Sequence, residues 1–424
     1  MTKLGPLALT VCSSAFVKLG RAQAAACGYP DLPIAVVPHP FSARSREQVR
    51  ELAAQCANDI AKLVANLDNS EPSGTRAAIA TRAALFEVDD DLQAINAFIM
   101  QQRWGDGLPV VPPTGERVAA MLRGSPRKAD EVIARIAPGF GAASIERIAI
   151  NAVMAGCEPA HLPVLIAATA AVCERPFNLQ GVQTTTDPVA VWLIVNGPIA
   201  QQLNMNSGAN CLGQGNWANA TLGRALRLIL QNIGGALPGD MDRATQGQPG
   251  KISFCCAENE AENPWQALHV ERGYQPAQST VTVVGAEGTM NMHSYGKNAD
   301  DILRVFADTM MHGPSNEYVH GGEPWIVLSP EHAEILHDAG YSKADVQQKL
   351  WEWSKMQAGR MTPEDMGRAQ ASRTAAYGPI NADTLLTIAH TPQDIAIIVA
   401  GGAGAHTVYI PCFGNTRSVT RAIE

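Results

Sequence analysis

A thiol and an imidazole follow the ends of two predicted strands near the amino terminus. Cys12 comes directly after the apolar run 7–11, and His39 follows the run 34–37 within a Pro-His-Pro sequence. The carboxyl ends of parallel strands meet at one edge of a sheet, where α/β proteins bind ligands. Cys12 also precedes a predicted helix, whose first amide groups favour the thiolate. The sequence therefore predicts a thiol–imidazole site; the alternative is a small buried thiol and a simple turn.

A loop rich in asparagine and glycine is the second candidate site. Residues 204–216 contain four asparagines and three glycines, with Cys211 in the middle, and precede an apolar helical pattern. Such a loop is costly to order, and it presents N–H and amide groups to an anion or a carbonyl. We predict Cys211 as a nucleophile or redox thiol; the alternative is a structural crossing in which Cys211 packs inward. The predicted substrate-binding residues are Asn204, Asn206, Asn210, Asn216, Thr185 and His406.

Two adjacent thiols and an acidic side chain follow a predicted strand at 252–256. Alternation along a strand sends Cys255 and Cys256 to opposite faces, so they cannot serve one site together. Glu258 or Glu260, a few residues further on, is a candidate general acid or base, whereas the alternative is a solvated glutamate at a strand end.

Five histidines between His293 and His337 raise the question of a metal site. His332 and His337 are five residues apart on one predicted helix and do not share a face, and the chain has no HExxH sequence. We assign no metal ligand and leave the cofactor open. His320 is the best local candidate, because two glycines follow it and allow a ligand to approach closely. The alternative is a hydrolase or lyase whose metal is held by histidines of 293–406.

The elements that would position these residues begin with a small parallel α/β unit. The predicted elements are strand 7–11, helix 15–26, strand 34–37 and a helix from Ser42 or Ser45 to about residue 67. The apolar face of the last helix is predicted at Val49, Leu52, Cys56, Ile60, Leu63 and Leu67. This order indicates parallel pairing with right-handed crossovers. Two strands make a poor sheet, so we expect another chain to supply a missing strand–helix pair.

The rest of the chain predicts a linker and a larger domain. Residues 68–89 are assigned to the linker, because the run DNSEPSGT at 68–75 is polar and contains proline and glycine. Residues 90–250 form a helix-rich part, and helices alternate with strands over 251–424. No internal repeat is visible. The predicted fold is α/β, with a small parallel-sheet amino-terminal domain and a larger mixed α/β domain.

Composition limits the class of protein. The 424 residues carry a formal net charge of −8, and only 17% are charged, which predicts an oligomer. No stretch concentrates Lys and Arg, so nucleic-acid binding is not expected, and no apolar run is long enough to predict a membrane helix. Nine cysteines without a CxxC pair indicate reduced thiols in a cytoplasmic protein. A signal peptide at 4–17 is rejected, because Pro6 and the polar residues 12–14 interrupt the apolar run.

Two runs near the amino terminus carry a family resemblance. They are TVCSSAF at 10–16 and GYPDLPIAVVPHP at 28–40. Residues 4–67 resemble the bacterial proteins named for a UGSC motif, in which selenocysteine or cysteine is followed by Gly-Ser-Cys. The resemblance places that motif on a strand–helix unit before the matching segment, so its redox residue transfers to no position here. It therefore implies a small companion subunit that carries the motif, unless the protein works without it. The remainder, including 106–114, resembles a larger domain seen with UGSC units.

Together these features predict an enzyme that acts on a small organic molecule by cysteine-thiol chemistry. The reaction would be a redox step or cleavage of a carbon–heteroatom bond. Cys211 or Cys12 would supply the thiol, and His39 or His320 would assist it. Beside the metal enzyme, a second alternative is a scaffold subunit that activates a small CGSC-bearing partner.

Overall fold

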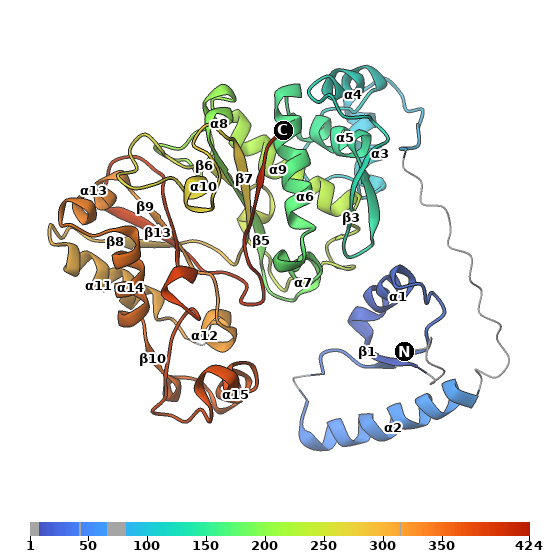
Figure 1. Cartoon of the computed structure of the whole chain (residues 1–424). Coiled ribbons are helices and arrows are strands. Elements are labelled where there is room, and N and C mark those ends of the chain that lie inside the picture. The colour runs from blue at the N-terminus through green and yellow to red at the C-terminus, as the bar shows by residue number, and fades with distance from the viewer. Residues whose placement is uncertain (1–7, 42–43, 66–81, 314) are drawn as a thin grey trace.

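The structure is a computed structural model, which describes residues 8–41, 44–65, 82–313 and 315–424. It confirms the α/β class. The amino-terminal unit consists of β1 (Thr10–Ser13), α1 (Val17–Ala26), β2 (Ile34–Val37) and α2 (Arg46–Ala65). Strands β1 and β2 are parallel, as expected, and the unit lies beside a much larger body (Figure 1).

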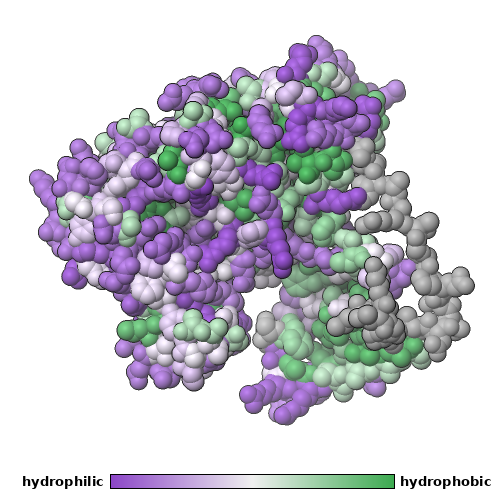
Figure 2. All heavy atoms as spheres, viewed as in Figure 1, coloured by the Kyte–Doolittle hydropathy of each residue, from purple (hydrophilic) through white to green (hydrophobic). Residues whose placement is uncertain are grey.

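Helix α2 shows why this unit is only partly packed. Its residues of intermediate exposure are Val49, Leu52, Cys56, Ile60 and Leu63, which confirms the predicted apolar face over the described residues. No residue of α2 whose side chain is described is buried. In the sheet, Val11 is 48% exposed and Val36 is 45% exposed. Figure 2 shows hydrophobic surface gathered over this unit. A two-stranded sheet thus leaves much of its apolar surface in contact with water.

Polar side chains cap the first helices of the large body. Helix α3 (Leu92–Gln101) is capped by Asp91, α4 (Gly115–Leu122) by Thr114 and α5 (Ile145–Ala155) by Ser144. Each cap oxygen accepts a hydrogen bond from a backbone N–H of the first turn, which would otherwise lack a partner. Glycine ends α5, because Gly156 adopts a φ of 88°. The hairpin of β3 (Val132–Ile136) and β4 (Gly141–Ser144), which the sequence did not predict, precedes α5.

Two four-stranded sheets form the centre of the body. The first sheet has the order β14-β7-β5-β6, with bounds Val419–Ala422, Thr280–Ala286, Ala190–Asn196 and Cys255–Ala257. The second has the order β12-β9-β13-β8, with bounds Ala396–Val399, Trp325–Leu328, His406–Ile410 and Met290–His293. Strand β5 therefore pairs with strands from beyond residue 251, so the segments 90–250 and 251–424 share one sheet.

Helices cover the outer face of each sheet, which makes four layers (Figure 1). The first sheet is covered by α6 (Leu162–Val172) and α9 (Trp217–Asn232), on which α5 packs. The second is covered by α11 (Ala299–Met310), α13 (Pro330–Asp338) and α14 (Lys343–Trp353). Alternate residues of one strand face the two layers: Leu193 and Val195 contact the helices, whereas Trp192 and Ile194 face the second sheet. Smaller elements are α7 (Leu179–Thr184), α8 (Pro198–Gln202), α10 (Leu268–Glu271), α12 (Asn316–His320), β10 (Met356–Gln357), α15 (Pro363–Tyr377) and β11 (Leu385–Leu386).

The two sheets repeat one topology, which the sequence does not reveal. In each, an edge strand pairs in parallel with its neighbour, and two antiparallel strands follow. Each half of the chain builds three strands of its own sheet and donates its fourth to the other: β8 follows β7 but joins the second sheet, and β14 follows β13 but joins the first. The prediction that the chain has no internal repeat is therefore wrong at the level of topology.

Contacts between the sheets agree with a pseudo-twofold arrangement. The two crossover segments pair in an antiparallel bridge between Ala286 and Cys412. Trp192 pairs with the residue two positions before one bridge residue, and Trp325 with the residue two positions before the other. These equivalent indole rings are fully buried and meet edge to face, with centroids 5.5 Å apart. No helix among the described residues is long and apolar enough to span a membrane.

Candidate functional site

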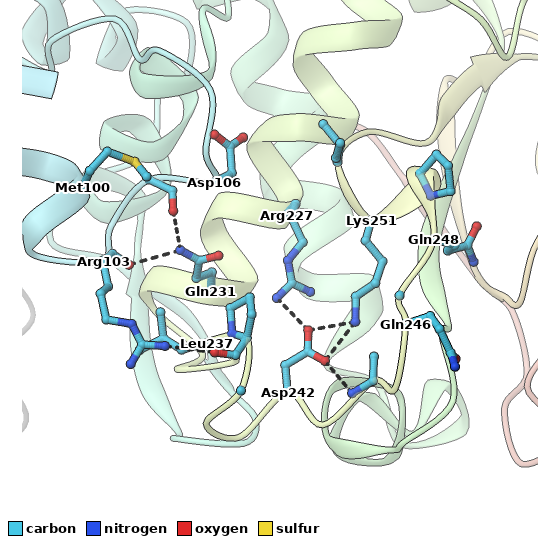
Figure 3. Close-up of a pocket in the computed structure, with 17 residues that line it drawn as sticks. Met100, Arg103, Asp106, Arg227, Gln231, Leu237, Asp242, Gln246, Gln248 and Lys251 are labelled. Atoms are coloured by element: carbon cyan, nitrogen blue, oxygen red, sulfur yellow. Dashed lines mark hydrogen bonds and ion pairs between the residues drawn. The ribbon is translucent and has the colours of Figure 1, made fainter. Parts of the chain in front are cut away.

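A pocket of about 710 Å³ lies between the end of α3, helix α9 and the chain segment 237–252. Figure 3 shows Arg227 and Lys251 pointing toward Asp242 on one side of it, and Arg103 and Gln231 on the other. We call it the Arg227 pocket. Its volume lies within the range typical of small-molecule sites.

One carboxylate in this pocket is shared by two cations. Lys251 Nζ lies 2.8 Å from Asp242 Oδ2, and Arg227 Nη2 lies 3.5 Å from the same oxygen. The guanidinium of Arg227 also donates to Gln183 Oε1 and to the carbonyl of Ala236. Burial lowers the pKa of Arg227, and Asp242 only partly opposes this. Burial likewise lowers the pKa of Lys251, with Asp242 opposing and Arg227 adding to the effect. A single carboxylate therefore incompletely compensates two partly buried cations.

The opposite wall comes from the rigid segment that follows α3. Asp106 accepts two hydrogen bonds from Arg224, at 2.7 and 2.9 Å. Burial opposes ionisation of Asp106, but the hydrogen bonds and charge of Arg224 outweigh it and hold the carboxyl pKa below its ordinary value. Gln231 donates to the carbonyls of Arg103 and Gly105, which fixes this wall against α9.

A second hollow, of about 470 Å³, separates the amino-terminal unit from the large body. We call it the His39 hollow; its charged lining residues are Lys18, Asp240 and Arg243. Lys18 forms an ion pair with Asp240, and Arg243 donates to the carbonyl of Gly239. Gly239 lines the Arg227 pocket as well, so the segment 237–243 divides the two hollows.

At the carboxyl edge of β1 and β2, serines replace the expected thiol. Ser13 Oγ lies 3.2 Å from His39 Nδ1, and the backbone N–H of His39 donates to Ser14 Oγ. Strand β1 runs through Ser13 rather than ending at residue 11, so Cys12 lies within the strand. Its sulfur is packed so closely against α1 that a methyl group on Gly20 would lie 2.9 Å from it. The expectation that Cys12 follows the strand is therefore wrong, whereas His39 does lie at this edge.

The asparagines of the 204–216 loop hold the loop itself together. Asn206 donates to the carbonyl of Ala209, Asn210 to that of Gln214, and Asn216 to that of Asn204. Asn216 also caps α9. These hydrogen bonds engage the amide groups of three of the four asparagines that the sequence suggested for ligand binding.

Cys211 of this loop lies between the two sheets. It is 5% exposed and belongs to the same buried cluster as Cys256. A hydrogen bond with Cys256 lowers the pKa of the Cys211 thiol, although burial opposes it, and the pKa of Cys256 is raised well above its ordinary value. Cys255 faces the helices instead, so the prediction that these neighbouring thiols point to opposite faces is confirmed. All nine cysteines are free thiols.

Glu258 lies buried at the end of β6, with 3% of its surface exposed. Its carboxylate accepts hydrogen bonds from Asn196 Nδ2, Asn263 Nδ2 and the backbone N–H of Leu268. Burial raises the pKa of Glu258 to about 6, and the charge of Lys343 together with the hydrogen bonds from Leu268 and Asn196 limits the rise. The carboxylate therefore ties the end of β5 to the loop after β6 and to the start of α10.

Two of the histidines face each other in the second sheet: His293 on β8 pairs with His406 on β13, and their ring centroids lie 6.1 Å apart. His332 is buried and bonded to Thr407 and to the carbonyl of Ser294. His406, on β13, lies 3.2 Å from Asn291 through its Nδ1 atom. His320 ends α12, and burial together with two nearby arginines lowers its pKa. In the described part of the chain, no three His, Cys, Asp or Glu side chains are grouped as metal ligands.

A carboxyl cluster, which the sequence did not suggest, lies at the crossover between the halves. Asn316 donates through one amide nitrogen to Asp187 Oδ2 at 2.9 Å and to Glu287 Oε1 at 2.6 Å. The adjacent Glu317 is fully buried and accepts hydrogen bonds from the Tyr409 hydroxyl and the backbone N–H of Cys412. Burial raises the pKa of Glu287 to about 8, as it does for Glu317.

Thr185 was predicted as a site residue, whereas Arg227 was not. Thr185 accepts a hydrogen bond from the backbone N–H of Asp187, which places it beside the carboxyl cluster. Arg227 was missed, although its sequence context carried a signal: the helix has leucines on both sides of it, at 226 and 228. An arginine embedded in a buried helical run usually has a partner or a ligand.

The fold and these sites define an α/β protein with a small parallel unit attached to a four-layer body. Residues 1–66 match the model of the UGSC family. The amino-terminal unit is therefore a UGSC-like domain. No curated protein and no solved structure significantly matches the chain.

Proposed function

We propose that this protein is an enzyme that acts on a small organic molecule bound in the Arg227 pocket. The observation that carries the proposal is the position of this pocket, which shares Gly239 with the His39 hollow. A hollow of small-molecule size thus adjoins the edge of the UGSC-like domain at which α/β units place their chemistry.

The groups at that edge suit proton transfer. His39 lies within hydrogen-bond reach of Ser13, and histidine is the side chain that most often serves as a general acid or base. Cysteine chemistry remains the proposed reaction type, and Cys12 is the thiol next to Ser13 in the sequence. Neither Cys12 nor Cys211 is among the residues that line the Arg227 pocket. A substrate in the pocket would therefore meet a thiol in one of two ways. Either the UGSC-like domain moves and brings Cys12 to the pocket, or another chain supplies the thiol.

Consumption of small molecules tests this function. Purified protein is incubated with a small-molecule extract of cells, with and without a thiol reductant, and mass spectrometry identifies compounds that disappear. We expect at least one compound to be consumed by the native protein and not by His39→Asn. His337→Asn is the matched control, because His337 is exposed and lies far along the chain on α13. Equal consumption by His39→Asn would show that His39 takes no part in the reaction. No consumption by the native protein would contradict the proposal that it is an enzyme.

A second candidate function is a subunit that works with a small CGSC-bearing companion. The specific observation is the incomplete packing of the UGSC-like domain. An apolar hollow of about 380 Å³ lies between its sheet and α2, lined by Val11, Val37, Phe41 and Leu52 among others. An added strand and helix would cover such a surface and complete the sheet. In this arrangement the companion supplies the reactive thiol, and this chain supplies the substrate pocket.

A further inference from the structure

We infer that the Arg227 pocket recognises its ligand through an anionic group, a carboxylate or a phosphate, held by Arg227 and Lys251. The inference rests on the proposed function in one respect: it takes this pocket to be the place where the small molecule binds. It goes beyond that function by naming the substrate class.

Charge balance is the first argument. Three cationic side chains line the pocket, Arg103, Arg227 and Lys251, against two carboxylates, Asp106 and Asp242. Asp106 is already bonded twice to Arg224, an arginine outside the lining, so its charge is compensated there. The pocket therefore carries an excess of positive charge in a chain whose formal net charge is −8.

Burial is the second argument. The side chain of Arg227 is 12% exposed, that of Lys251 is 17% exposed and that of Asp242 is 6% exposed. An excess charge that has lost most of its water is unfavourable unless an opposite charge compensates it. Burial lowers the pKa of both cations, and the nearby carboxylates only partly oppose this. An anionic ligand would supply the missing charge.

Hydrogen-bonding capacity is the third argument. A guanidinium has five N–H donors, and the acceptors of Arg227 are Gln183, Ala236 and Asp242. An ammonium has three donors, and Lys251 directs two of them to the two carboxylate oxygens of Asp242. Donors therefore remain for a ligand oxygen, and charged donors form the strong hydrogen bonds that select anions.

The test uses three probes in equilibrium with the whole chain: inorganic phosphate, succinate, and succinamide as the uncharged counterpart of succinate. Melting temperature is measured against probe concentration at pH 7 and constant ionic strength. We expect a saturable rise with phosphate or succinate and none with succinamide. The two anions distinguish a phosphate-type from a carboxylate-type ligand by which one binds more tightly.

Two variants assign the binding to the named cations. Because Asp242 has two partners, Lys251→Met leaves it paired with Arg227, and Arg227→Met leaves it paired with Lys251. Each variant should therefore fold, and each should weaken anion binding at least about tenfold, the loss expected for one charge-assisted hydrogen bond. Arg117→Met is the control, since Arg117, on α4, is exposed and its guanidinium donates to the carbonyl of Pro112.

The outcomes separate this inference from the proposed function. A shift with succinamide equal to that with succinate, or anion binding kept within twofold in both variants, overturns the inference. If neither anion binds while a neutral compound is consumed in a reaction that needs His39, the proposed function is supported and the anion site is wrong. If the anions bind as expected and no compound is consumed, the anion site is supported and the proposed enzymatic function is wrong.

Discussion

At the scale of single residues, burial decides between two interpretations of the same side chain. Cys211 has the sequence context of a reactive thiol, in a loop of asparagines and glycines. In the fold the loop amides bond to the loop, and the thiol lies between two sheets beside Cys256. His39 keeps its predicted place at a strand end, and Ser13 takes the place expected for Cys12.

Substitution of Cys211 tests its role. Cys211→Ser places a hydroxyl in an apolar cluster, so we expect the free energy of unfolding to fall by about 1–2 kcal/mol. Urea unfolding measures this change, with Cys27→Ser as the control, because Cys27 is exposed. Unchanged stability together with lost turnover would instead make Cys211 the reactive thiol.

The carboxylate of Asp242 should matter more for stability than either of the two cations that share it. Asp242→Asn leaves two partly buried cations without their carboxylate, and we expect a loss of about 2–4 kcal/mol in the free energy of unfolding. Lys251→Met removes one cation and keeps one ion pair, so its loss should be under about 1.5 kcal/mol. Chemical denaturation of both variants makes the comparison, and Asp338→Asn on the surface of α13 should change little. Equal losses from Asp242→Asn and Lys251→Met would contradict the shared-charge description.

At the scale of elements, the UGSC-like domain is less completely packed than the body. Its two strands have four paired residues, and the apolar face of α2 is only half-buried. Strands β5 and β7, in contrast, pair over seven residues within a covered sheet.

Amide hydrogen exchange measures this difference. We expect the amides of β1 and β2 to exchange orders of magnitude faster than those of β5 and β7, because local opening requires less apolar surface to be exposed. A companion chain that adds a strand and a helix should slow exchange in β1 and β2 and co-purify at a one-to-one ratio. Slow exchange of β1 and β2 in this chain alone would mean that the domain is complete without a companion.

At the scale of the whole molecule, two halves of one topology exchange their last strands. The crossover segments meet at the bridge between Ala286 and Cys412, and the carboxyl cluster lies there. Ionisation of these carboxyl groups should therefore weaken the contact between the two halves of the body.

The pH dependence of stability should report this cluster. The pKa of Glu317 is raised to about 8 in the folded chain from an ordinary value of 4.5, mainly by burial, and the pKa of Glu287 is also about 8. The folded state therefore binds more protons than the unfolded state between these pH values, so the free energy of unfolding falls as pH rises from about 5 to 8. The groups that face Glu317 and Glu287 are Tyr409, Tyr318, Cys412, Asn316 and Asp187.

A neutral variant checks the assignment. Glu317→Gln keeps one oxygen that can accept from the backbone N–H of Cys412, and its amide N–H can donate to the Tyr409 hydroxyl. It cannot ionise, so the fall in stability between pH 5 and 8 should be smaller by up to about 1.4 kcal/mol per pH unit. Denaturant unfolding at several pH values gives this slope. Glu331→Gln is the control, because Glu331 is exposed in the first turn of α13. A slope unchanged by Glu317→Gln would place the titrating group elsewhere.

The sequence by itself determined the local structure and the family of the amino-terminal unit. Capping by Thr114 and Ser144, the apolar face of α2 and the opposite faces of Cys255 and Cys256 follow from hydrogen bonding and periodicity within a few residues. Only the tertiary structure decided the pairing of β7 with β5 and β14, the exchange of β8 and β14, and the meeting of Arg227, Asp242 and Lys251. The physical reason is that period and capping act between neighbours along the chain, whereas strand partners and shared charges are selected by burial across long separations.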